Sequence, residues 1–130
     1  MKEDNMVRTI DDLLNLIYAK ENKEAATLIT PKTINMQNAS GLSPLMIAAS
    51  ARNKRMVLHL LANGADMSLK SKAGCTVWDF ANTEMKQFLK SAVEIIKQMP
   101  IKRSFVYNGY CERVLSAVNK YTRENSGHTR

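Results

Sequence analysis

Two histidines, two cysteines and a pair of neighbouring aspartates are the side chains whose types could support catalysis or metal binding. They are His59, His128, Cys75, Cys111, Asp11 and Asp12. No nucleophile, base and orienting acid stand together in a local motif. The separations between the cysteines and histidines match no zinc signature, and neither G-x-x-x-x-G-K-[ST] nor G-x-G-x-x-G occurs. We therefore expect no enzyme, no cofactor and no bound metal.

These residue types also have structural interpretations. His59 stands beside the apolar stripe of a predicted helix, so we expect a partly exposed helix residue. Asp11 and Asp12 stand in the first turn of another predicted helix, where carboxylates face the positive end of the helix dipole. Two cysteines are too few for a disulfide framework, which indicates a reducing, intracellular compartment. A disulfide between Cys75 and Cys111 is the alternative.

Charge and aromatic residues gather near the carboxy terminus. The net charge of the chain is +7, of which residues 83–130 carry +5, from nine Lys and Arg against four Asp and Glu. Cations that hold phosphates beside rings that stack on bases are typical of nucleic-acid binding. The candidates for contacts with nucleic acid or an acidic partner are Lys97, Lys102 and Arg103, with Phe105, Tyr107 and Tyr110. We favour the alternative that the aromatic residues are buried beneath a docked tail helix.

The elements that would position any site repeat with a period of 33 residues. Gly41 to Ala49, GLSPLMIAA, is answered by Gly74 to Asn82, GCTVWDFAN. Ser43 followed by Pro44 predicts a helix start and a helix to about residue 51. A second helix is predicted over about 54–62, before Gly64, where a helix can end in a left-handed residue.

This pattern resembles the ankyrin repeat, whose family signature is G-x-T-P-L-H-x-A-A followed by a second helix and L-L-x-x-G-A-D. Leu60-Leu61 and Gly64-Ala65-Asp66 supply the second part, and the resemblance covers about residues 9–89. Met46 and Asp79 replace the histidine of the family, which puts its side-chain network between repeats in doubt. The resemblance implies an all-α solenoid in which hairpin fingers project from pairs of helices, with Met36–Leu42 and Leu69–Cys75 as its two fingers.

The resemblance also implies which positions face a partner. They lie on the fingers and the inner helices, and the alternative is that they are merely tolerated at the solvent surface. In the middle repeat they are Gln37, Ala39, Ser40, Leu42, Ser50 and Ala51, and in the next repeat Lys70, Lys72, Ala73 and Cys75. This set contains no Trp or Tyr that could anchor an interface, so we expect either modest affinity or additional contacts from elsewhere, such as the carboxy-terminal extension.

The domain is predicted to have three repeats and a tail. We assign residues 1–8 to a flexible terminus and 9–99 to the repeats, with units over about 9–40, 41–73 and 74–99. Thr9 and Asp12 predict a capping box at the first helix, and Thr76 and Asp79 predict one in the third repeat. A second helix of the first repeat is expected over about 24–29, and a long closing helix runs from Asn82 towards residue 99. Shortened connections are common in terminal ankyrin repeats.

Residues 100–130 form a basic extension outside the repeats. Apolar residues at helical spacing predict a helix over about 109–123 that docks on the closing helix. Phe105 to Gly109 could instead enter a β-hairpin.

The sequence therefore predicts a non-enzymatic, intracellular protein-protein interaction module, such as an adaptor, inhibitor or assembly subunit. It has neither a signal peptide nor a run long enough to span a membrane, so we expect a cytoplasmic or nuclear protein. The alternative function is nucleic-acid binding through the tail, and self-association is a third hypothesis.

Overall fold

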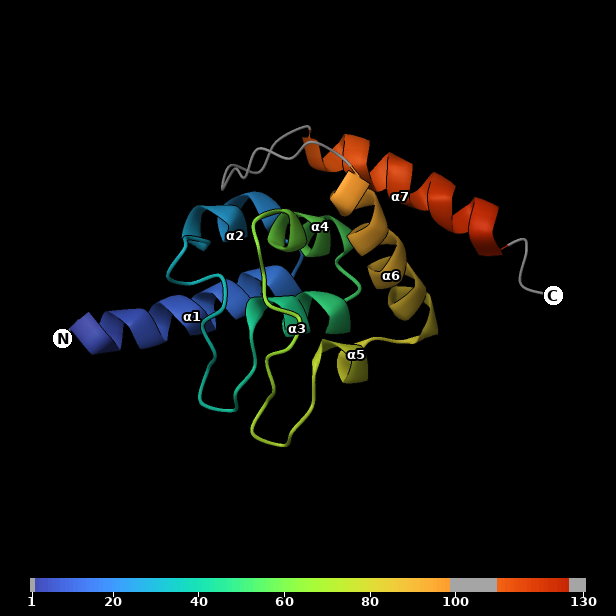
Figure 1. The fold of residues 1–130 in the computed structure, drawn as a ribbon. Coiled ribbons are helices and arrows are strands. Elements are labelled where there is room, and N and C mark those ends of the chain that lie inside the picture. The colour runs from blue at the N-terminus through green and yellow to red at the C-terminus, as the bar shows by residue number, and fades with distance from the viewer. Residues whose placement is uncertain (1, 99–109, 127–130) are drawn as a thin grey trace.

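The computed structural model describes the backbone of residues 2–98 and 110–126, and side chains within 9–98 and 113–124. Within these ranges the chain forms seven helices and no strand. Their bounds are α1 Lys2–Tyr18, α2 Asn22–Leu28, α3 Pro44–Ser50, α4 Lys54–Ala62, α5 Val77–Phe80, α6 Thr83–Gln98 and α7 Tyr110–Ser126 (Figure 1). The predicted all-α fold is confirmed.

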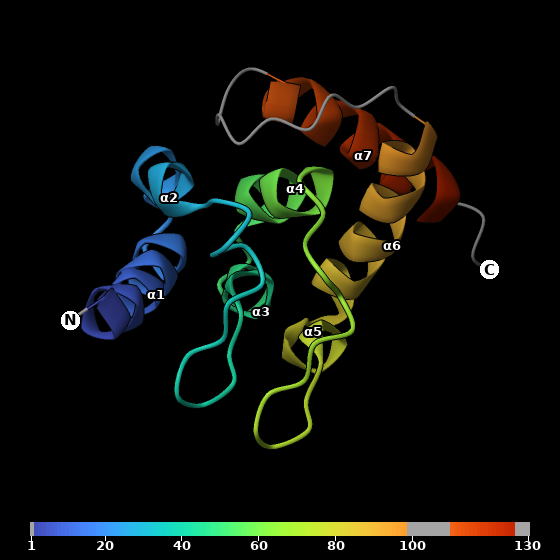
Figure 2. The ribbon, with the colours of Figure 1, turned by 60° about the vertical axis from the view of Figure 1, so that its left-hand side comes forward.

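The helices form two layers. Helices α1, α3 and α5 contact one another in order as the inner layer, while α4 packs on both α3 and α6 in the outer layer. Figure 2 shows α2 and α4 beside each other above this inner layer. Two hairpin loops, the fingers, project from the inner layer on the side away from α7 in both views (Figures 1 and 2).

Both helices of the middle repeat begin with a side-chain cap. Ser43 Oγ accepts from the Met46 amide at 3.3 Å at the start of α3, and Pro44 occupies the first turn, where a missing N–H leaves no partner unsatisfied. Asn53 Oδ1 accepts from the Met56 amide at 3.2 Å and begins α4. The helix pair predicted over 44–51 and 54–62 is confirmed.

The third repeat is shortened between its helices. Asn82 begins α6 as Asn53 begins α4, with its Oδ1 accepting from the Met85 amide at 2.8 Å. It follows Asn53 by 29 residues instead of 33, and α5 accordingly has only 4 residues. The predicted capping box of Thr76 and Asp79 is present. This repeat therefore closes the stack with a short inner helix and a long outer one.

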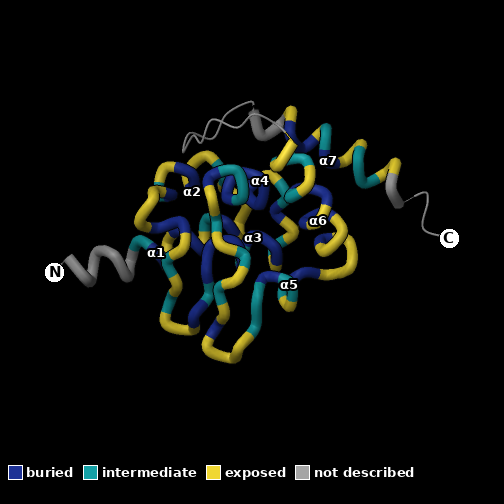
Figure 3. The backbone as a smooth tube through the Cα atoms, in the orientation of Figure 1, coloured by how far each residue is buried: buried dark blue, intermediate teal, exposed yellow. Residues whose placement is uncertain are grey.

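The core follows the stack and extends into the tail helix. Buried side chains of α1, α3, α4 and α6 form one continuous cluster, which also includes Val114, Leu115 and Val118 of α7. Figure 3 shows buried segments gathered among the helices and mostly exposed residues at the finger tips. Helix α7 packs on α6 and α4, as expected for a docked tail.

Two expectations about local structure are wrong. Helix α1 begins at Lys2 and not at Thr9, because residues 2–8 contain neither glycine nor proline and nothing in them stops a helix. His59 is 2% exposed and not a partly exposed residue. Every residue from Met56 to Leu60 is buried, because α4 lies between α3, α6 and α7 and is covered on more than one face.

No helix within the described parts of the chain is both long and apolar enough to cross a membrane.

Candidate partner-binding surface

Each finger is a short hairpin that closes in the same way, 33 residues apart. The Asn38 amide donates to the Leu42 carbonyl at 3.0 Å, and the Ser71 amide donates to the Cys75 carbonyl at 2.8 Å. Gly41 and Gly74 take the left-handed turn position, with φ of +79° and +83°, a conformation that costs glycine little. The two fingers therefore share one backbone design.

Side chains inside each finger fix its turn. Asn38 Oδ1 accepts from the Ser40 and Leu42 amides, both at 2.9 Å. In the second finger, Ser71 Oγ accepts from the Cys75 amide at 3.2 Å. Asparagine and serine hydrogen-bond readily to nearby backbone amides, which stabilises such turns.

The two fingers are also bonded to each other. Gln37 Nε2 donates to the Gly41 carbonyl within its own finger and to the Lys70 carbonyl in the next, at 2.7 Å each. The Lys72 amide donates to the Ser40 carbonyl at 3.0 Å. A Cβ placed on Gly41 would lie 2.6 Å from the Lys72 amide nitrogen. The fingers therefore form one joined surface.

The residues expected at the partner surface fall into three groups. Ala39, Ser40, Lys70, Lys72 and Ala73 are exposed around the finger tips, and Ser50 is exposed at the end of α3. Leu42, Ala51 and Cys75 are half-buried. Gln37 is exposed, but its amide nitrogen holds the fingers together. The expected residues within 37–42 and 70–75 thus lie on the two fingers, whereas Ser50 and Ala51 lie at the carboxy-terminal end of α3.

Met46 and Asp79 replace the histidine of the family signature. In both repeats this side chain accepts a hydrogen bond from the backbone amide of the residue that caps the inner helix. Met46 Sδ accepts from the Ser43 amide at 3.5 Å, and Asp79 Oδ2 accepts from the Thr76 amide at 2.9 Å. Both atoms therefore meet an amide at a helix start that has no partner in the helix itself.

The pKa shifts of His59 and Asp66, which lie outside the fingers, follow from the surroundings of each side chain. Burial lowers the pKa of His59, since desolvation disfavours its charged form. Hydrogen bonds from the Ser68 hydroxyl, at 2.6 Å, and the Ser68 amide, at 2.8 Å, lower the pKa of Asp66 in the turn after α4. Among the residues that the structure describes, no three His, Cys, Asp or Glu side chains gather as a metal-binding group.

The basic candidates in the tail remain a prediction. Lys97 is exposed on α6, with its Nζ 3.9 Å from Glu94 Oε1. Lys102 and Arg103 lie outside the described residues, as do Phe105 and Tyr107.

Sequence reasoning missed the residues that join the units. Asn53 Nδ2 donates to the Ile17 carbonyl at 2.9 Å and to Asn22 Oδ1 at 2.7 Å, and so connects the first repeat to the second. Asn35 Oδ1 accepts from the Asp66 amide at 2.8 Å. The 33-residue period offered one signal for a contact between repeats, because Gln37 and Lys70 occupy the same position in successive repeats.

Comparison with known proteins gives a family match in the middle of the chain. Residues 40–72 match the family model described as Ankyrin repeat. Oxysterol-binding protein-related protein 1 of Rattus norvegicus is 39% identical over 88 residues, which cover 63% of this chain. The match spans 9% of that relative's length. No significant match was found among solved structures.

Proposed function

We propose that this chain, in which residues 40–72 are an ankyrin repeat, binds a protein partner through its two fingers and the exposed ends of the inner helices. Ankyrin repeats are protein-protein interaction modules. The observation that carries the proposal is the pair of hydrogen bonds from Gln37 Nε2, one within its own finger and one to the next. They hold two exposed hairpin tips in a fixed relation.

Such a surface is ordered before a partner arrives. Immobilising a loop on binding costs free energy that is subtracted from affinity, so a surface fixed in advance loses less. The Lys72 amide bond to the Ser40 carbonyl adds to this order. Because α7 packs on α4 and α6, away from the fingers (Figure 2), the tail helix leaves the finger side open.

The chemistry of the exposed tips indicates the kind of contact. Ala39 and Ala73 allow a partner to approach closely, and Lys70 and Lys72 favour acidic groups opposite them. An adaptor, inhibitor or assembly subunit would use such a surface. Oxysterol binding is not part of the proposal, because the related rat protein is matched over only 9% of its length.

The test is recovery of a partner from the native cell with matched charge variants. The double substitution Lys70→Glu and Lys72→Glu changes two exposed finger side chains without removing the backbone bonds. Lys20→Glu with Lys23→Glu makes the same change in charge at two exposed lysines, one in the turn after α1 and one in the first turn of α2. We expect the finger variant to lose the partner and the control to retain it.

Equal recovery with both variants would contradict the proposal. Light scattering across protein concentration separates a partner from self-association, because a second copy of the chain would raise the mass of the protein alone.

A further inference from the structure

A cleft lies where the tail helix meets the outer layer of the repeats. Its volume is about 430 Å³, and it is lined by Lys54 of α4, by Glu84, Gln87 and Phe88 of α6, and by Asn119, Thr122 and Arg123 of α7. Three separate helices thus build it, and it exists only with α7 docked. None of its lining residues belongs to a finger.

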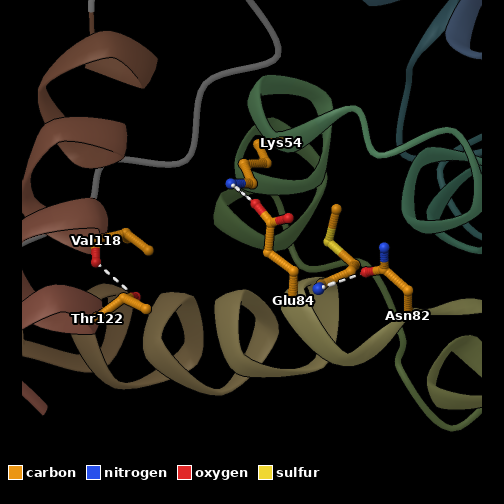
Figure 4. A network of polar contacts seen from close by, with 6 residues as sticks. Lys54, Asn82, Glu84, Val118 and Thr122 are labelled. Carbon is orange, nitrogen blue, oxygen red and sulfur yellow. Dashed lines mark hydrogen bonds and ion pairs between the residues drawn. The ribbon is translucent and has the colours of Figure 1, made fainter. Parts of the chain in front are cut away.

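Two cations, Lys54 and Arg123, line the cleft, and Lys54 is held in place by packing. Lys54 Nζ lies 5.3 Å from the centroid of the Phe88 ring, a geometry in which the ring face attracts the cation. Phe88 itself is 2% exposed and therefore fixed. Arg123 supplies a second cation from α7, and Gln87 and Asn119 add amide groups that donate hydrogen bonds. Thr122 Oγ1 donates to the Val118 carbonyl at 2.8 Å (Figure 4).

One cation of the cleft, Lys54, already pairs with a carboxylate of the chain. Glu84 Oε1 bonds Lys54 Nζ at 2.8 Å (Figure 4). The hydrogen bond and charge of Lys54, together with the charge of Arg52, lower the pKa of Glu84, so the local field favours an anion. The Glu84 side chain is 70% exposed. An exposed ion pair of this kind holds weakly and exchanges with competing groups.

We propose that the cleft between α4, α6 and α7 binds an acidic segment of a protein partner, and that Glu84 occupies part of the site until a partner carboxylate replaces it on Lys54. The incoming carboxylate gains Lys54 and Arg123 on two sides of the cleft, and its segment meets the amides of Gln87 and Asn119. Glu84 turns outward to water when it is displaced.

This site goes beyond the function proposed above, since it uses no finger residue. In Figures 1 and 2, α7 and the fingers lie at opposite sides of the helical layers. The two proposals therefore fail independently: substitutions at Lys70 and Lys72 leave the cleft intact, and substitutions in the cleft leave the fingers intact.

The experiment follows the amide resonances of the ¹⁵N-labelled full chain by NMR during titration with an acetylated hexaglutamate peptide. Hexaglutamine is the uncharged control peptide. We expect saturable shifts at Gln87, Asn119 and Thr122 with hexaglutamate alone. Loss or gain of one charge contact at an exposed site changes affinity by about two- to five-fold.

Two variants move the affinity in opposite directions if Glu84 competes with the peptide. Lys54→Gln removes a cation and should weaken hexaglutamate binding, whereas Glu84→Gln removes the competitor and should strengthen it. Lys86→Gln, at an exposed α6 position outside the cleft, is the control for net charge and should change the affinity less than Lys54→Gln does. Thermal unfolding of each variant verifies that it is folded.

The proposal is overturned if hexaglutamate shifts no cleft resonance, or if Glu84→Gln weakens binding as Lys54→Gln does. Shifts confined to Lys70 and Lys72 would place the acidic segment on the fingers instead. A hexathymidylate oligonucleotide that binds the cleft more tightly than hexaglutamate would assign the site to nucleic acid and also overturn it.

Discussion

Replacing each finger glycine by alanine gives a direct measure of how firmly the two fingers are joined. Gly41 and Gly74 occupy the same turn position and have nearly the same φ, +79° and +83°. Their surroundings differ. A Cβ on Gly41 would lie 2.6 Å from the backbone nitrogen of Lys72, whereas a Cβ on Gly74 would have nothing within 4 Å.

Backbone strain destabilises the two alanine variants equally. A left-handed conformation costs an alanine about 1–2 kcal/mol relative to its right-handed one, and both variants pay it. The gain from a less flexible unfolded chain is also common to both. These contributions cancel when the two variants are compared.

The difference comes from the neighbouring finger. The clashing atom at Gly41 is backbone, which cannot rotate aside, so the fingers must separate. Separation breaks the Lys72 amide bond to Ser40 and the Gln37 bond to Lys70, each worth about 0.5–1.5 kcal/mol. Gly41→Ala should therefore lower the free energy of unfolding by about 1–3 kcal/mol more than Gly74→Ala does.

Urea unfolding of both variants, followed by circular dichroism, measures this difference. A difference of that size corresponds to about 3–5 °C in Tm for each kcal/mol. Gln37→Ala provides a second check. It should destabilise the parent chain more than it destabilises the Gly41→Ala variant, where the bond to Lys70 is already broken and only the bond to the carbonyl of residue 41 remains. Equal losses for the two glycine variants would refute the claim that the fingers are joined.

Three further predictions concern the helices. Asn53→Ala should lower the free energy of unfolding by about 2–4 kcal/mol in urea, because it removes a helix cap and two bonds to the first repeat, while Asn82→Ala removes a cap and should cost about 1 kcal/mol. The free energy of unfolding should fall as pH decreases below about 6.5, because His59 binds a proton more readily in the unfolded chain than in its buried native position. His59→Leu should flatten this pH dependence, and an unchanged slope would contradict the role of His59. Val118→Ala should destabilise the chain by about 1–2 kcal/mol because Val118 is 0% exposed against α6 and α4, whereas Asn119→Ala should change it by less than about 0.5 kcal/mol.

The repeat fold was predictable because local signals and the period agree. Ser43 and Pro44 mark a helix start that needs no tertiary partner, and Gly41 and Gly74 mark the finger turns. The beginning of α1 was not predictable from Thr9, because a capping motif inside a helix looks the same in sequence as one at its end. The burial of His59 also escaped prediction, since it depends on α6 and α7 packing around α4.

The candidate surface was only partly accessible to sequence reasoning. The repeat register placed Gln37 among the finger residues, but the bond of its side chain to the Lys70 carbonyl depends on how far apart the two fingers stand. The cleft was invisible in the sequence. Lys54, Glu84 and Arg123 come from three helices, and no local spacing relates them.

The central claim is that the joined fingers contact a protein partner, and site-directed photocrosslinking tests it most directly. A photoreactive residue replaces Ala39 or Ala73 at the exposed finger tips, or Lys23 on the exposed side of α2 as the control. Our account predicts that both finger positions crosslink the same protein in the native cell and that position 23 does not. Crosslinking of the partner from position 23 alone would contradict it.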